Sequence, residues 1–299
     1  MSETIVALAG TPRGETLAMA LALLSALAHA GFGALQKGRH DPWLTRGAID
    51  ASLVVLSLPL ALFAVPWPRG FEWLVLLGAA ALHFVYKLLI AMAYTRAAYT
   101  VVYPVVRGTG PVITVLFAGL VFGEHFSGIQ WLGVALVSGA ILSLSLVNLR
   151  RAPADPATLR AGIWLALLGG VSVAAYTTYD AFGIRLTPDP FTFLAWFFLV
   201  TSLDFPIIAL LRWRRMANPP SPGPLMARGL LGAVIAFISF GGVMLATRLD
   251  KVGEAAVLRE TSTVFAALIG WLVLREEIGA VRAALMILIA AGAVLVEIA

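Results

Sequence analysis

The sequence predicts an all-α membrane protein of ten transmembrane helices, arranged as two inverted five-helix repeats around a central cavity. Three observations support this fold class: an apolar composition, ten separate hydropathy runs, and charged residues that recur in register between the two halves. Of the 299 residues, 60% are hydrophobic and 12% are charged, whereas soluble domains have about 45–50% and about 25%. Lipid must therefore cover much of the surface.

Each apolar run has roughly the 17–25 residues that a helix needs to cross a hydrocarbon core of about 30 Å. The runs are continuously apolar rather than alternating, which favours helices over the strands of a barrel. The first run also resembles a signal peptide, but it continues to Leu35 and is needed as a span. We place the spans at residues 16–35, 49–65, 71–93, 99–122, 129–147, 162–182, 191–211, 228–247, 254–274 and 279–298.

An ungapped shift of 152 residues places the fourth and fifth spans on the ninth and tenth. It aligns Arg107 with Arg259 and Glu124 with Glu276. The chain therefore looks like a duplicated five-helix unit, and an odd number of spans per unit gives the two copies opposite orientations. Two inverted halves can open a central cavity to each side in turn, which is the geometry of a transporter.

The longest polar stretch divides the chain into the two predicted domains. The first five-helix repeat covers residues 1–148, the connecting loop residues 149–160, and the second repeat residues 161–299.

The basic residues give an orientation. Thirteen of the 21 Lys and Arg residues lie in loops that follow odd-numbered spans. On the opposite side there are five: Arg13, Arg69, Arg185, Arg248 and Lys251. Because basic loops stay in the cytoplasm, this count places both termini outside.

The two hairpins that join the fourth span to the fifth in each half carry Gly123-Glu124 and Arg275-Glu276. With ten spans in two five-span units, the chain resembles the EamA-type branch of the drug/metabolite transporter superfamily. That resemblance implies a bacterial inner-membrane protein, both termini in the cytoplasm (against the charge count), and a cavity lined by spans 1, 3, 4, 6, 8 and 9. Relatives carry amino acids, including aromatic ones, and amines, sugars and nucleotide sugars.

Several function classes lack their motifs. The sequence has no nucleotide-binding loop, no catalytic constellation and no acid–histidine cluster with metal spacing. We therefore expect no enzyme, no metal and no cofactor, and transport that is not driven by ATP. The net charge of +5 lies in short loops, so it indicates topology rather than a nucleic-acid partner.

Ionisable side chains within spans are costly, about 2.5–3.5 kcal/mol each at mid-bilayer, and they mark functional positions. In the third span His83, Tyr86 and Lys87 share one helical face. We expect them to line the cavity. The alternatives are a snorkelling Lys87 and a buried, hydrogen-bonded His83.

In the sixth span Tyr176 and Tyr179 precede Asp180 at helical spacing. Their rings suit an amphipathic substrate or, equally, a membrane-interface belt. Asp180 lies near the end of its run, where it could meet headgroups. Asp204 of the seventh span is expected to make a local hydrogen bond or a helix contact.

The fourth span contains Pro104 and Pro111 on either side of Arg107. Proline removes a backbone donor, so we expect this helix to be kinked or broken beside a wet cavity. Arg107 and Tyr103 would then meet substrate, unless Arg107 is only a structural bridge. In the other half Arg259 and Glu260 could form a comparable gate.

The residues predicted to bind substrate are His83, Tyr86, Lys87, Tyr103, Arg107, Tyr176, Tyr179, Arg259 and Glu260.

The excess of Lys87, Arg107 and Arg259 over Glu260 predicts a net positive cavity. The leading hypothesis is a secondary transporter of small anionic or zwitterionic metabolites, most of all amino acids, working by alternating access. Coupling to protons or to a counter-substrate stays open. The alternatives are an exchanger of organic phosphates or sugars with the same fold and, from another class, a membrane-embedded enzyme.

Overall fold

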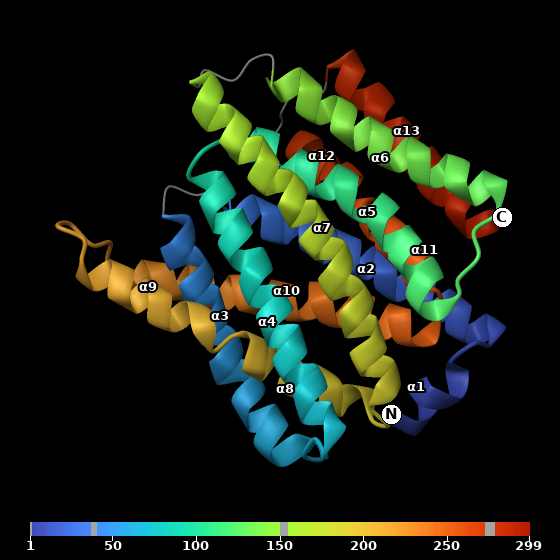
Figure 1. The fold of residues 1–299 in the computed structure, drawn as a ribbon, viewed down its shortest axis with the longest axis horizontal. Helices are drawn as coiled ribbons and strands as arrows, with labels where there is room; N and C mark the ends of the chain where they lie inside the picture. The colour runs from blue at the N-terminus through green and yellow to red at the C-terminus, as the bar shows by residue number, and fades with distance from the viewer. Residues whose placement is uncertain (1, 37–40, 150–154, 273–278) are drawn as a thin grey trace.

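The computed structural model describes residues 2–36, 41–149, 155–272 and 279–299. Ten of its helical segments are long and apolar enough to cross a membrane, which confirms the all-α, ten-span prediction (Figure 1). The second hairpin motif, Arg275-Glu276, lies outside the described residues.

The spans follow one another along the chain, after a short helix α1 (Ser2–Leu8). Those of the first half are α2 (Pro12–Gln36), α3 (Pro42–Pro59) continued by the π-helical turn η1 (Leu60–Ala64), α4 (Phe71–Tyr94), α5 (Tyr99–Phe122) and α6 (Gly128–Leu149). Those of the second half are α7 (Pro156–Leu186), α8 (Pro190–Thr201) with α9 (Asp204–Arg214), α10 (Pro222–Leu249), α11 (Val252–Arg259) with α12 (Ser262–Leu272), and α13 (Ala280–Ile298).

Five spans begin with proline at the first helical position, where its missing N–H is not needed. Asp41, Asp155 and Asp189 precede three of these prolines and cap the helix by accepting backbone N–H bonds. Hydrogen bonds from Thr158 hold the pKa of the Asp155 carboxyl below its usual value. These local signals place the start of α3, and with it part of the site wall.

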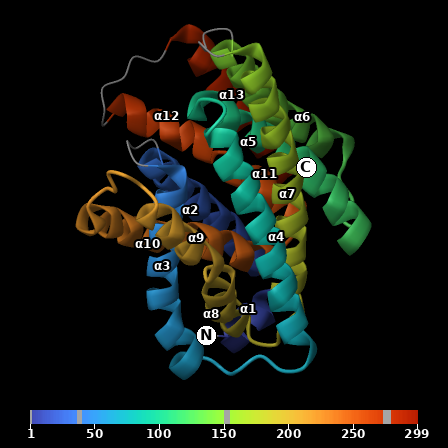
Figure 2. The same ribbon diagram turned by 60° about the vertical axis from the view of Figure 1, so that its left-hand side comes forward.

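The two halves pack in a reciprocal way. The third span of the first half, α4, packs on the first span of the second half, α7, while α10 packs on α2. The last spans α6 and α13 lie side by side (Figures 1 and 2). There Gly133 and Gly292 allow the backbones to approach so closely that a Cβ on either would meet the other's carbonyl oxygen within 2.7 Å, as small residues do in membranes.

The sequence predicts that the fourth span is kinked or broken, and the prediction of a break is wrong. The helix α5 runs without interruption from Tyr99 to Phe122 through both of its prolines. The breaks lie instead in the seventh span, between Thr201 and Asp204, and in the ninth span, between Arg259 and Ser262. Both interruptions face charged side chains of neighbouring helices, which are described next.

Candidate functional site

A cavity of about 510 Å³ lies where the first half of the chain meets α10. It is bordered by the end of α2, the start of α3, the end of α4 and the start of α5, so it is close to the loops that follow the first and third spans. Its polar and aromatic lining consists of His29, Phe32, Thr45, Arg46, Tyr86, Lys87, Tyr94, Tyr99, Thr100, Tyr103, Arg107 and Phe240.

Aromatic rings form a continuous wall on one side of this cavity. The ring centroids of Tyr94 and Tyr99 are 5.4 Å apart, and those of Tyr99 and Tyr103 are 5.0 Å apart in a stacked arrangement. The imidazole of His29 stacks at 6.4 Å from Tyr103 and meets Phe240 edge-on at 6.2 Å. Flat apolar faces with hydroxyl groups at their edges suit an amphipathic ligand.

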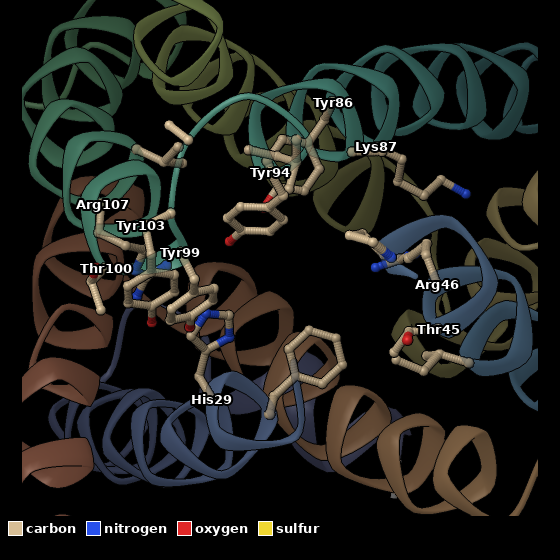
Figure 3. Close-up of a pocket in the computed structure, with 18 of the residues that line it drawn as sticks. His29, Thr45, Arg46, Tyr86, Lys87, Tyr94, Tyr99, Thr100, Tyr103 and Arg107 are labelled. Carbon is tan, nitrogen blue, oxygen red and sulfur yellow. The ribbon is translucent and has the colours of Figure 1, made fainter. Parts of the chain in front are cut away.

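Cations stand on two sides of the cavity. Figure 3 shows Tyr99, Tyr103 and Arg107 on one side and Arg46 with Lys87 on the other. The Lys87 ammonium is turned away from the tyrosines. The charge of Lys87 is therefore not directed at the aromatic wall, although Lys87 lines the cavity.

Lys87 is engaged by three acceptors. Its Nζ donates to Asp50 Oδ2 at 2.9 Å, to the Thr201 carbonyl at 2.6 Å, and to a carboxylate oxygen of Asp204. Arg46 pairs with the same Asp50 at 2.8 Å. Two cations and two carboxylates balance, so Lys87 supplies no excess charge and does not snorkel. The predicted net positive charge therefore does not come from Lys87, because Asp50 and Asp204 neutralise it.

Arg107 links α5 to the break in the ninth span. Its Nη2 donates to the Arg259 carbonyl at 3.2 Å and to Ser262 Oγ at 3.1 Å, while its Nε lies 2.9 Å from Glu260 Oε2. Arg107 therefore satisfies a carbonyl that the end of α11 leaves free, as a helix C-terminus requires. It is a structural bridge that also faces the cavity.

Arg259 lies beside this bridge and not in the cavity. Its guanidinium carbon is 4.8 Å from the Phe240 ring centroid, within the range of a cation–π contact. With Arg107, Arg259 and a single Glu260, this group has one positive charge in excess. An anionic ligand group at the Arg107 end of the cavity would balance it.

The structure divides the nine predicted binding residues. Tyr86, Lys87, Tyr103 and Arg107 line the cavity. Tyr176 and Arg259 line a separate void of about 10 Å³, and His83 lines another of about 20 Å³. Glu260 pairs with Arg107. Tyr179 packs against Gly78 and Phe182, at the interface of α4 and α7 and outside the lining of the cavity.

Several lining residues were not predicted. His29, Arg46, Tyr99 and Phe240 come from the ends of helices or from spans with few polar residues. The four-residue spacing of Tyr99 and Tyr103 would have signalled one shared face. The sixth and ninth spans, which the resemblance places at the cavity, border the small void in this structure, whereas α3 of the second span lines the main cavity.

At the opposite end of the bundle, ion pairs and hydrogen bonds to the backbone hold neighbouring segments together. Glu124 of the first hairpin accepts from the Val252 and Gly253 N–H groups, at 2.7 and 3.0 Å, and so caps α11. Arg185 donates to the carbonyls of Thr247 and Asp250. Partial burial acts to lower the pKa of Lys251, but its hydrogen bond and ion pair with Glu254, together with the carboxylates of Asp250 and Glu124, raise the pKa overall. The contacts of Glu124 tie the two halves together, and the others hold the second half in place at this end.

The fold and the cavity define the class: a multi-pass integral membrane protein with a ligand-sized internal chamber. Residues 160–298 match the EamA-like transporter family. This match confirms the resemblance predicted from the sequence and indicates a membrane transporter of small molecules. The family consists of transporters rather than enzymes.

Comparison with solved structures supports the fold. A crystal structure described only as that of a "protein" superposes with a TM-score of 0.75 over 94% of this chain and 95% of the other, at 17% sequence identity. At this identity the likeness concerns the fold alone. No curated protein matches the sequence.

Proposed function

We propose that the protein is a secondary transporter of small metabolites that carry a carboxylate, amino acids first and aromatic ones above others. The observation that carries this proposal is the composition of the cavity wall, where four of the six tyrosines of the chain surround a space that ends at Arg107. Its volume of about 510 Å³ lies within the range of small-molecule sites, about 300–1,000 Å³.

In the proposed binding mode, different residues of the cavity bind different parts of the ligand. The rings of Tyr94, Tyr99 and Tyr103 would stack on an aromatic side chain, and their π faces would also accept an ammonium group. The carboxylate would lie at Arg107, where the excess positive charge is. Lys87 would hold the opposite wall in place through Asp50 and would not bind the carboxylate.

Alternating access between two inverted halves, residues 1–148 and 161–299, is the proposed mechanism. Two observations support the inverted repeat: the reciprocal packing of α4 on α7 and of α10 on α2, and the contact of Arg107 with Arg259, its partner at a shift of 152 residues. In the present conformation the cavity lies near the loops that follow odd-numbered spans. On the opposite side, the hydrogen bonds of Glu124 hold the two halves together. By the charge rule that cavity faces the cytoplasm, as an exporter in a bacterial inner membrane requires.

The direct test is counterflow in liposomes. Purified protein would be reconstituted with labelled phenylalanine, and exchange would be challenged with phenylalanine, tyrosine, glutamate, phenyl phosphate and glucose 6-phosphate. We expect aromatic amino acids to exchange best, and Tyr99→Ala with Tyr103→Ala to reduce exchange at least tenfold. Tyr179→Ala, outside the cavity, is the matched control and should stay within about twofold. Exchange of phosphate esters without amino acids would favour the phosphate exchanger instead.

The absence of cysteine from the sequence allows a second test. A membrane-impermeant thiol reagent should label Thr45→Cys in the cavity rapidly and Met244→Cys in the small void slowly. Labelling from one side of oriented vesicles would also fix which side the cavity faces. Equal labelling of both positions would contradict a cavity that is open to one side only.

A further inference from the structure

A buried histidine–carboxylate pair lies outside the main cavity. His83 Nε2 of α4 is 2.8 Å from Asp180 Oδ2 of α7, and both side chains are shielded from solvent. The imidazole is enclosed by rings, with Tyr176 at 4.3 Å and Phe197 at 4.9 Å between centroids. Asp180 therefore does not reach the headgroups, and neither residue takes part in the proposed binding of substrate.

The pair separates two small voids. His83 lines the one of about 20 Å³, which shares Arg46, Tyr86 and Phe240 with the main cavity. Asp180 lines the other, of about 10 Å³, together with Thr247. Each is close to the space of about 10–15 Å³ that one water requires. The Thr247 carbonyl accepts from Arg185 at the joined end of the bundle, so the two voids extend in opposite directions from the pair.

One oxygen of the carboxylate is left for a further partner. Asp180 Oδ1 is buried and has no hydrogen-bond partner among the described residues. A buried carboxylate oxygen without a donor is costly unless it meets water or carries a proton. This oxygen therefore marks the point at which a proton can leave or join the pair on the side of the smaller void.

The charged groups around the pair are few. On the His83 side Arg46 lines the void, and Lys87, one turn along α4, is engaged by Asp50 and Asp204. On the Asp180 side Arg259 lines the void, and from α7 itself the Tyr176 phenol does. The helices α8 and α10 contribute aromatic rings and hydroxyl groups to these walls.

We propose that His83 and Asp180 form a proton-binding site that couples transport to proton movement, an inference that rests on the proposed transport function. A proton from the larger void binds Nδ1 of His83, and the proton on Nε2 passes along the 2.8 Å hydrogen bond to Oδ2 of Asp180. The protonated carboxyl then rotates, so that the same proton faces the smaller void and leaves to it, and the carboxylate is restored. One proton enters and one leaves, and the imidazole returns to its starting tautomer when the proton on Nδ1 exchanges to Nε2.

Phe240 supplies the link to substrate. Its ring borders the main cavity and both voids, and it stands 6.5 Å from the His83 ring. A ligand that displaces Phe240 in the cavity therefore alters the walls of both voids, and with them access of water to each end of the pair.

The test uses full-length protein in liposomes that contain a pH-sensitive dye. With a gradient of labelled phenylalanine, we expect the wild type to move protons, and an imposed pH gradient to accelerate uptake at least fivefold. His83→Gln and Asp180→Asn should lose both effects and keep counterflow within about twofold. Asp180→Glu, which keeps a carboxyl, should retain part of the proton flux, and the exposed His125→Gln should retain all of it. Proton flux that persists in His83→Gln would overturn the proposal.

A second measurement does not need a substrate. In nanodiscs, ¹⁵N-histidine NMR should show that His83 changes its protonation with pH, and that this response differs in Asp180→Asn. A His83 ring that keeps one protonation state at every pH at which the protein stays folded would overturn the proton site. If His83 titrates but phenylalanine is not carried, the proposed function fails and the proton site stands.

Discussion

The fourth and ninth spans occupy equivalent places in the predicted repeat, yet they fold differently. The helix α5 contains two prolines and is continuous from Tyr99 to Phe122. The ninth span contains no proline and is broken between α11 and α12. The position of a break in this protein therefore does not follow the position of proline.

The difference lies in what satisfies the backbone. Around the break the sequence reads Glu260-Thr261-Ser262-Thr263, and the Thr261 hydroxyl donates to the Leu258 carbonyl at 2.7 Å. Such residues compete with the helix for hydrogen bonds. The end of α11 also receives a donor from another helix, since Arg107 binds the Arg259 carbonyl at 3.2 Å. A helix can end within a membrane where a neighbour supplies the missing partner.

The break in the seventh span repeats this arrangement. Thr201 is the last residue of α8, and its carbonyl accepts from Lys87 of α4 at 2.6 Å. In both spans a cation from the first half binds the C-terminal carbonyl of a broken helix in the second half. A cation at that end also complements the helix dipole. Lys87 and Arg107 are thus equivalent in role, although only Arg107 retains an excess of charge beside it.

The largest effect is expected at Arg107. Arg107→Met leaves Glu260 buried without its ion pair and the Arg259 carbonyl without its donor, so unfolding should become easier by about 3–5 kcal/mol. Thermal unfolding in detergent would measure this. In Arg107→Met/Glu260→Gln a substantial part of the loss should return, because the buried Glu260 charge that lost its ion pair is removed as well. Additive losses in this double-mutant cycle would show that the two side chains are not coupled.

Lys87→Met should have the next largest effect, a loss of about 3 kcal/mol, at the lower end of the range for a broken buried pair. Asp50 would keep Arg46 as a partner, and the Asp204 side chain is 24% exposed. The same unfolding assay applies. Because Lys87 is assigned to the wall and not to the carboxylate, ligand affinity per folded molecule should fall less than for Tyr103→Ala. A larger fall in ligand affinity for Lys87→Met than for Tyr103→Ala would show that Lys87 binds the ligand.

Much of the fold could be predicted from the sequence, since a bilayer accepts only long apolar helices and their runs are visible. The ion pairs between helices could not be predicted. The second span was placed at residues 49–65, which put Asp50 at its edge. The capped helix starts at Pro42, so Asp50 is buried a full two turns inside and meets Lys87. Which carboxylate neutralises which cation depends on helix rotation, and apolar runs with weak periodicity do not fix that rotation.

The N-termini of the two equivalent spans differ as well, and this difference gives a smaller prediction. Glu124 caps α11, whereas Ala98 at the start of α5 offers no side-chain acceptor. Glu124→Ala should cost about 1 kcal/mol, as the loss of a helix cap does. Glu124→Gln can still accept from the Val252 N–H and should cost less. We also expect faster thiol labelling of Met244→Cys in the Glu124→Ala background, and unchanged labelling would show that Glu124 does not help to close that end.

The smallest effect is expected at the prolines that the comparison began with. Since α5 is already continuous, Pro111→Ala would restore a donor for the Arg107 carbonyl without removing a break, and stability should change by no more than about 1 kcal/mol. Transport would distinguish two roles. If α5 acts as a rigid rod against the hinge of the ninth span, exchange in liposomes should also stay near the wild-type rate. A strong loss of exchange at unchanged stability would instead show that α5 bends at Pro111 during the cycle, and the two spans would then be alike in motion though not in the conformation seen here.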